Sequence, residues 1–275
     1  MDFEILQGMK VEDLARYMRA RLRLEEPLAP PLDFLTRMEP PEDFLIRAYV
    51  DSPESFQTRF VDALRQNLVR VTLDIVADDE RANEHVASLA FLADSIEANG
   101  LVYKLYELAT ALMQQPPGKW DSALFHLLRT TARLTSDDSL LPFWDRVSQD
   151  RRPRIREAGF YGLTKVAPDS TLEKLPEILA DRECDFSGLV WYMATEQPGL
   201  QVLAKAAQNL GEPEKQRLRE LLKNAGGDAE MLLELESGER VNQFHHVVNF
   251  PINRVAARRM PRWTEAPLAA QAAYG

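Results

Sequence analysis

Apolar residues recur at helical spacing along almost the whole chain, and no other feature constrains the fold as strongly. One long stripe places its apolar residues at helical intervals: Phe56, Phe60, Ala63, Leu64, Val71 and Ile75. This spacing puts side chains on one face of an α-helix, the face that packs into a core. The strict alternation typical of half-buried strands is almost absent. The sequence therefore predicts an all-α protein.

Prolines, glycines and short polar runs divide the helical segments into pairs. The expected pairs are 53–76 with 81–98, 101–115 with 119–134, 138–149 with 153–167, 171–181 with 186–196, and 199–209 with 212–224. Successive pairs begin roughly 30–50 residues apart, which is the spacing of helical-hairpin repeats. We therefore predict a right-handed stack of antiparallel helix pairs.

Composition divides the chain into three parts. We expect residues 1–50 to form an irregular, Pro-rich helical cap, residues 51–236 the helical repeats, and residues 237–275 an extended, basic tail interrupted by prolines. Within the cap, Asp33–Arg37 is repeated almost literally as Asp43–Arg47. The repetition is compatible with a tandem docking motif. Two short helices pinned by the flanking prolines explain it more simply, and we favour them.

One segment, Asp150–Pro168, carries both the start and the stop signals of a single helix. Its inward-facing residues are expected to be Ile155, Ala158, Leu163 and Val166. Gly159 and Gly162 each cost about 1 kcal/mol of helix propensity relative to alanine. Because they lack side chains, they also let a neighbouring helix come close. The segment is therefore typical of a helix packed within a stack.

The order of residues in this segment resembles the second helix of a HEAT repeat: Ile155-Arg156, Ala158, Gly162-Leu163 and Val166. Asp150 stands where an acidic turn residue usually precedes that helix, and the preceding 139–147 suits the first helix of the pair. The resemblance implies a HEAT-like α-solenoid. It also implies an adaptor or scaffold, since most HEAT-like proteins serve in that way, although a few are enzymes such as alkyl-purine DNA glycosylases and bilin lyases.

The charge of the chain is unevenly distributed. The formal net charge is −10, and residues 1–150 carry all of it, with 16 Lys and Arg against 26 Asp and Glu. Residues 151–275 hold 17 of each sign. An electrostatic partner of the first half should therefore be basic. Broad binding to DNA is disfavoured because the chain has no overall cationic surface.

The sequence offers little support for metal or nucleophile chemistry. His245 and His246 are adjacent, so on a helix they point about 100° apart, and no cysteine cluster accompanies them. Cys184 lies between Glu183 and Asp185, whose charges raise the pKa of a thiol, so we expect a structural cysteine. Nucleotide-binding and hydrolase motifs are absent. We therefore predict no metal, no cofactor and no catalytic residue.

Two Trp-Asp pairs, Trp120-Asp121 and Trp144-Asp145, invite comparison with the HEAT-like glycosylases. The HEAT-like glycosylases use aromatic residues and an aspartate on a strongly basic surface, so membership of that group would imply the same for this chain. The acidic first half of this chain argues against nucleic acid as a partner.

The sequence also bears on location. The chain contains no uninterrupted apolar run approaching ~18 residues and no signal peptide. With one cysteine it cannot form an internal disulfide, which is typical of a reducing compartment. We expect a cytoplasmic protein without a membrane span.

The functional hypothesis is a non-enzymatic adaptor or scaffold that binds another protein, as a subunit or regulator of a larger complex. The candidate contact residues are all arginines: Arg151, Arg152, Arg154, Arg156, Arg254, Arg258 and Arg259. Two alternatives stay open. The acidic first half could cover a basic enzyme, as an inhibitor or immunity protein does, or the chain could be a HEAT-like nucleic-acid-processing enzyme. The sequence leaves the oligomeric state open.

Overall fold

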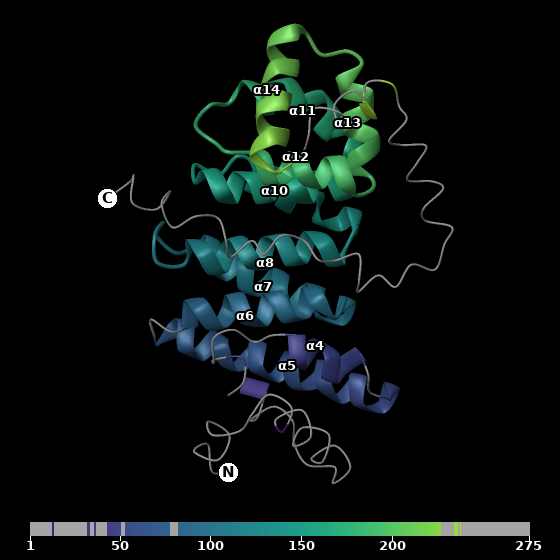
Figure 1. Cartoon of the computed structure of the whole chain (residues 1–275). Helices are drawn as coiled ribbons and strands as arrows, with labels where there is room; N and C mark the ends of the chain where they lie inside the picture. The colour runs from purple at the N-terminus through teal and green to yellow at the C-terminus, as the bar shows by residue number, and fades with distance from the viewer. Residues whose placement is uncertain are drawn as a thin grey trace.

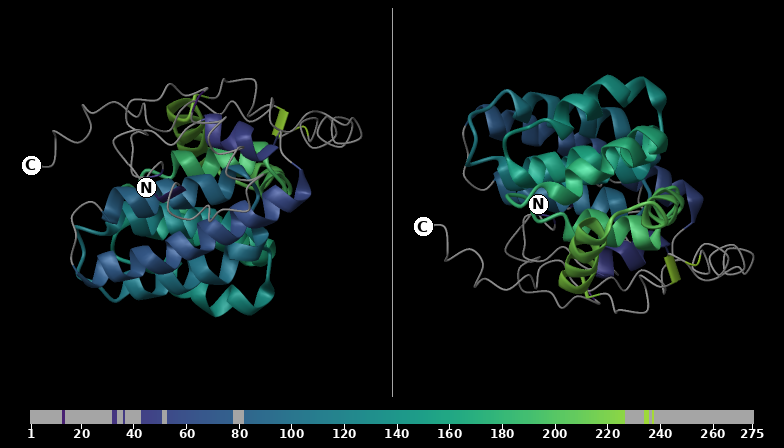
Figure 2. Two further views of the ribbon diagram at one scale, coloured as in Figure 1. Left: turned by 90° about the horizontal axis from the view of Figure 1, so that it is seen from below. Right: turned by 90° about the horizontal axis from the view of Figure 1, so that it is seen from above.

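The computed structural model describes residues 43–50, 53–77 and 82–226, together with the single residues 13, 32, 33, 36, 234, 235 and 237. Within these ranges the protein is all-helical and contains no strand (Figure 1). The predicted all-α class is therefore confirmed. In Figure 1 the molecule runs from α4 and α5 at the bottom through α6, α7, α8 and α10 to α11–α14 at the top, and Figure 2 gives two views along this direction.

The bounds of the helices agree closely with the predicted segments. The α-helices are α4 Asp43–Val50, α5 Glu54–Val76, α6 Ala82–Ser95, α7 Val102–Met113, α8 Asp121–Leu134, α9 Leu141–Ser148, α10 Pro153–Val166, α11 Pro168–Ala180, α12 Ser187–Thr195, α13 Gly199–Ala207 and α14 Glu212–Asn224. Two short 3-10 helices, η1 Asn99–Leu101 and η2 Asp138–Leu140, precede α7 and α9. Every helix expected between residues 53 and 224 has a counterpart.

Helix α6 ends earlier than the sequence suggests. The expected segment runs to residue 98, just before Asn99-Gly100, but α6 ends at Ser95 and Glu97 adopts a φ of 54°. The backbone N–H of Ala98 then donates to the carbonyl of Ala93 at 2.9 Å. This pattern closes a helix with one left-handed residue, a position that usually holds glycine. A prediction that ends this helix just before the next glycine, Gly100, therefore places the end of α6 too late.

Two prolines occupy helix starts in ways that the sequence did not resolve. Pro168 was expected only to end a helix, but it is also the first residue of α11, which begins three residues before the expected 171. Proline suits this position because the first turn of a helix has no use for its missing N–H. Pro53 precedes α5 with an extended backbone, so α5 begins at Glu54. Ser52, the expected cap, lies outside the described residues.

One continuous cluster of buried side chains runs through the described helices, from Leu32 to Leu235. Helix α4 joins it, because the rings of Tyr49 and Phe60 lie 5.5 Å apart. The division predicted between residues 50 and 51 remains a prediction. Most of the predicted tail lies outside the described residues, since only residue 237 of it is described.

Helices α6, α8 and α10 form a row in the middle of the molecule. Helix α8 contacts both α6 and α10, while α5, α7 and α9 pack against α6, α8 and α10 respectively. More than half of the residues of α8 are buried, and its remaining side chains are mostly half-buried. The exposed parts of this row therefore come from one narrow face.

The two glycines of α10 mark the closest helix contact in this region. A Cβ atom at Gly159 would lie 2.5 Å from the carbonyl carbon of Val147 and 2.6 Å from Cα of Ser148. A Cβ atom at Gly162 would lie 2.6 Å from Cε2 of Trp144. Helix α9 therefore crosses α10 in contact with its backbone, and the expected close approach at both glycines is confirmed.

Candidate interaction surface

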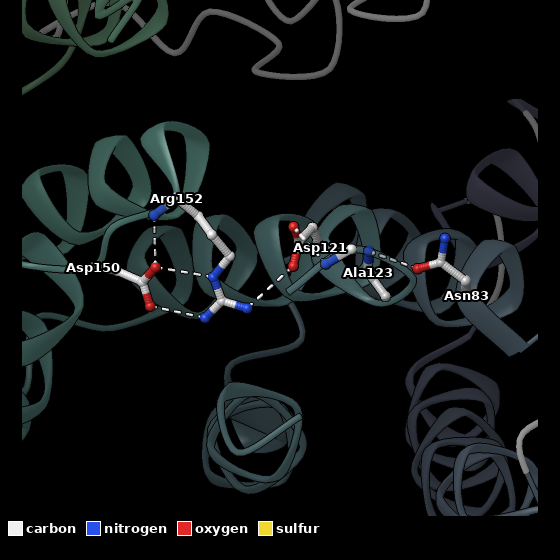
Figure 3. Close-up of polar contacts among 6 residues, drawn as sticks. Asn83, Asp121, Ala123, Asp150 and Arg152 are labelled. Carbon is white, nitrogen blue, oxygen red and sulfur yellow. Dashed lines mark hydrogen bonds and ion pairs between the residues drawn. The ribbon is translucent and has the colours of Figure 1, made fainter. Parts of the chain in front are cut away.

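Arg152 is held by two carboxylates at the start of α10. Its guanidinium donates to Asp150 at 2.9 and 2.8 Å and to Oδ1 of Asp121, at the start of α8, at 3.1 Å (Figure 3). The Arg152 side chain is 12% exposed. These bonds join the turn before α10 to α8. They also raise the pKa of Arg152, so the charge of this side chain is permanent.

Arg156 also stabilises the packing of the helices. Its Nη2 donates to Oδ2 of Asp181 at 2.7 Å, and its Nη1 donates to the backbone carbonyl of Asp150 at 3.3 Å. The Arg156 side chain is 19% exposed. Like Arg152, it donates hydrogen bonds to other parts of the protein, and these bonds join α10 to the turn after α11.

Arg151 and Arg154 are exposed. The guanidinium carbon of Arg154 lies 4.4 Å from the centroid of the Phe125 ring, on α8. The four arginines of 151–156 that the sequence grouped together therefore separate into two that brace the fold and two that face outward. The other three candidates, Arg254, Arg258 and Arg259, lie outside the described residues.

Side chains of neighbouring helices cap α8 and α12. Oδ1 of Asn83, on α6, accepts the backbone N–H of Ala123 at 3.0 Å (Figure 3). Oε1 of Glu157, on α10, accepts the backbone N–H of Leu189 at 2.9 Å. Ala123 and Leu189 are each the third residue of their helix, where the N–H has no partner within the helix. Each cap therefore stabilises a helix and its neighbour's position together.

We define the α6–α8–α10 face as the side of the row on which Asp94 of α6 meets Arg133 of α8, at 3.0 Å. Phe91 lies one helical turn before Asp94 and is 50% exposed. Arg129 lies one turn before Arg133, and its guanidinium carbon is 5.6 Å from the centroid of the Tyr161 ring on α10. This face therefore combines an exposed phenyl ring with arginines placed beside aromatic rings.

Sequence reasoning did not single out Phe91. Val86, Leu89, Ala90 and Ala93 of α6 are buried at helical spacing, and Phe91 falls outside that stripe. A large apolar residue off the stripe was the available signal, because the period of the helix turns its side chain away from the core.

Arg154 and Arg129 create a positive environment around His126, on α8. Burial, followed by the charges of Arg154 and Arg129, lowers the pKa of His126 to about 4. The imidazole is therefore neutral at physiological pH. It is half-buried on α8, in keeping with the expectation for a histidine among apolar neighbours.

Glu157 lies at a crevice between α10 and the start of α12. The crevice encloses about 10 Å³, and its lining includes Phe125, Arg129, Tyr161 and Leu189. This is room for about one water molecule. Burial raises the pKa of Glu157 to about 7, although Arg129, the N–H of Leu189 and Arg154 all oppose the rise. Glu157 therefore changes charge near neutral pH.

The residues of the two Trp-Asp pairs are engaged within the protein, the tryptophans in the core and the aspartates in ion pairs. Trp120 and Trp144 are buried, so neither offers a ring to a nucleic-acid base. Asp121 binds Arg152, and Asp145 binds Lys174 at 2.8 Å.

The single cysteine also belongs to the core. The thiol of Cys184 donates to the carbonyl of Pro153 at 3.1 Å, and burial raises its pKa to about 12. A thiol in this state is a poor nucleophile, which agrees with the expected structural role.

The described residues contain neither a cluster of metal-binding side chains nor a membrane-spanning helix. In that part of the chain, no group of three or more His, Cys, Asp and Glu side chains is placed to hold a metal ion. None of the helices described is long and apolar enough to cross a membrane. His245 and His246 lie outside these residues.

Comparisons of the chain with protein-family models, with curated proteins and with solved structures found no match. The resemblance to a HEAT repeat therefore remains a prediction, carried by residues 150–168.

Proposed function

We propose that this chain is a cytoplasmic, HEAT-like α-helical repeat protein, built as a right-handed stack of antiparallel helix pairs. We propose further that it acts as a non-enzymatic adaptor, binding another protein as a subunit or regulator of a complex. The observation that carries the proposal is the row of α6, α8 and α10. Its members cap and brace one another, yet Phe91 on α6, Arg154 on α10 and Arg151 in the turn before α10 are exposed.

The bracing supports a binding role because repeats present extended surfaces on rigid supports. Asn83 and Arg152 join α6 to α8 and α8 to the start of α10, so the side chains on the face are fixed relative to one another (Figure 3). A preorganised surface loses less conformational entropy when it binds. The buried thiol of Cys184 agrees with a reducing compartment.

The test is reconstitution of a complex with the full chain. Affinity purification from the native host, followed by mass spectrometry, identifies candidates, and each is then purified and mixed with the chain. We expect one candidate to form a complex of fixed stoichiometry, with cross-links to α6, α8 or α10. If no candidate forms such a complex, or if the cross-links avoid these helices, the proposal is wrong.

A further inference from the structure

We propose that the partner presents an acidic segment with an apolar side chain to the α6–α8–α10 face. Carboxylates of that segment would bind Arg151 and Arg154, and its apolar side chain would cover Phe91. This inference rests on the proposed function, because it names the chemistry of the partner at the same surface.

The cations around this face differ in how they are held. Arg133 binds Asp94 at 3.0 Å, and Arg152 binds Asp150 at 2.8 Å. Arg154, in contrast, is exposed and lies over the ring of Phe125, and none of the ion pairs found among the described residues includes it. Its donors are therefore placed for a carboxylate from outside the chain.

The contact with Phe125 favours such recognition. A guanidinium held over an aromatic face keeps its N–H donors in its own plane, where they match the two oxygens of a carboxylate. The ring also limits the motion of the side chain before binding. Less entropy is then lost when a partner engages Arg154.

The local field has the sign that an acidic segment requires. His126 lies beside this site, and the charges of Arg154 and Arg129 contribute to lowering its pKa. The chain as a whole carries a net charge of −10, which repels an acidic partner at long range. Recognition of such a partner therefore depends on the few arginines of this face.

Phe91 supplies the apolar part of the site. Helices α6 and α8 run in the same direction, because Asn83 meets Ala123 near their starts and Asp94 meets Arg133 near their ends. Phe91 on α6 and Arg129 on α8 each lie one turn before that ion pair. A half-exposed phenyl ring on α6, on the same face as arginines of the neighbouring helices, has the composition of an interface anchor with a polar rim.

Nucleic acid fits this face less well. Tight binding to a phosphate backbone uses many cations, whereas Arg151 and Arg154 are the two exposed arginines that the described 151–156 segment offers. The Trp120 and Trp144 rings are buried and cannot stack on bases. An oligonucleotide is therefore included in the experiment as a competing outcome.

The probe is a short fluorescein-labelled peptide in which glutamates flank a leucine, titrated with the full chain by fluorescence anisotropy. A glutamine version, a lysine version and a single-stranded oligonucleotide serve as comparisons. We expect the glutamate peptide to bind most tightly. Arg154→Ala and Phe91→Ala should each weaken it by roughly tenfold or more, as loss of an interface anchor does.

Lys205→Ala is the matched control, because Lys205 is exposed on α13. It should bind the peptide as the unaltered chain does. Arg151 and Arg154 are exposed, so their variants should keep the melting temperature of the unaltered chain, and a loss of binding then reports recognition rather than unfolding. Equal binding of the glutamine peptide, unchanged binding by Arg154→Ala, or tighter binding of the oligonucleotide would overturn the inference.

The purified partner separates this inference from the proposed function. If the partner binds Arg151→Glu and Arg154→Glu as well as it binds the unaltered chain, the acidic-segment inference fails and the adaptor proposal stands. If the peptide binds but no partner protein forms a complex, the adaptor proposal fails and the inference about the partner fails with it. Sedimentation that shows a dimer dissociated by Arg154→Glu would make a second copy the occupant, and this would also overturn the inference.

Discussion

Replacing Gly159 by alanine tests the closest contact in the fold. The new Cβ would lie 2.5 Å from the carbonyl carbon of Val147 and 2.6 Å from Cα of Ser148. Carbon atoms normally pack at about 3.5–4.0 Å, so α9 must move by roughly 1 Å. Both atoms belong to the backbone of α9, and no side-chain rotation can relieve the contact.

The cost of this movement can be estimated from the residues that α9 buries. Trp144 is 0% exposed, and a buried tryptophan of about 200 Å² contributes roughly 5 kcal/mol. A gap of ~0.5–1 Å forfeits a quarter to a half of contact energy, or roughly 1–2 kcal/mol. Backbone strain adds about 1–3 kcal/mol, and the helix propensity of alanine returns about 1 kcal/mol. The net destabilisation is roughly 1–4 kcal/mol.

The assay is urea and thermal unfolding followed by circular dichroism. A loss of this size should lower the melting temperature by roughly 2–16 °C in a domain of this length. Gly100→Ala is the control, because the atom nearest to its added Cβ is Nη2 of Arg65 at an ordinary 3.7 Å. If Gly159→Ala instead raised stability by about 1 kcal/mol, propensity alone would decide the outcome, and the close crossing of α9 over α10 would be refuted.

Gly162→Ala tests the same crossing through a different neighbour. Here the added Cβ would meet the ring of Trp144, so a smaller residue should relieve the contact. We expect Gly162→Ala to destabilise the protein less in a Trp144→Leu background than in the unaltered chain. Strict additivity of the two changes in a double-mutant cycle would show that the residues do not touch.

Three further substitutions test the ion pairs of Arg152, the raised pKa of Glu157 and the left-handed backbone of Glu97. Arg152→Ala removes bonds to Asp150 and Asp121 and should cost about 1–3 kcal/mol in urea unfolding, while exposed Arg151→Ala should change stability by less than about 0.5 kcal/mol. The pKa of Glu157 is about 7 in the folded protein and about 4.3 in an unfolded chain, so the unfolded state loses its proton first and stability falls as pH rises between these values. Glu157→Gln should remove that fall, which is roughly 4 kcal/mol at most, and an unchanged dependence of the urea midpoint between pH 5 and 8 would contradict the assignment. Glu97→Gly should be about 1 kcal/mol more stable than Glu97→Ala, because the residue has a φ of 54°; equal melting temperatures would count against that backbone.

The helices themselves could be predicted because their signal is local. Each apolar stripe and each flanking proline or glycine lies within the segment that it defines, so existence and order followed from the sequence. The ends were harder to place. Glu97 takes a left-handed conformation that glycine usually takes, and Pro168 both follows one helix and starts the next. In both cases neighbouring helices select a conformation that residue type alone does not specify.

The arginines show why a site is harder to predict than a fold. The spacing of residues 151–156 suggests one cationic ridge, yet the partner of Arg156 is Asp181 and the partner of Arg152 is Asp121. These aspartates lie 25 and 31 residues away along the chain. Nothing in the local sequence assigns such pairs, because they depend on how α8, α10 and the turn after α11 come together.

The division of the four arginines gives the binding proposal its sharpest internal control. Arg152 and Arg156 brace the turn before α10, from which Arg151 and Arg154 project. Loss of a bracing arginine should therefore lower stability and binding together, and binding should recover under conditions that restore the fold. Loss of Arg154 should lower binding far more than stability, because the side chain is exposed and the buried carboxylate of Glu157 keeps Arg129 and the N–H of Leu189 as partners. If all four substitutions reduced binding only in proportion to their loss of stability, Arg151 and Arg154 would have no role in recognition, and the binding proposal would be wrong.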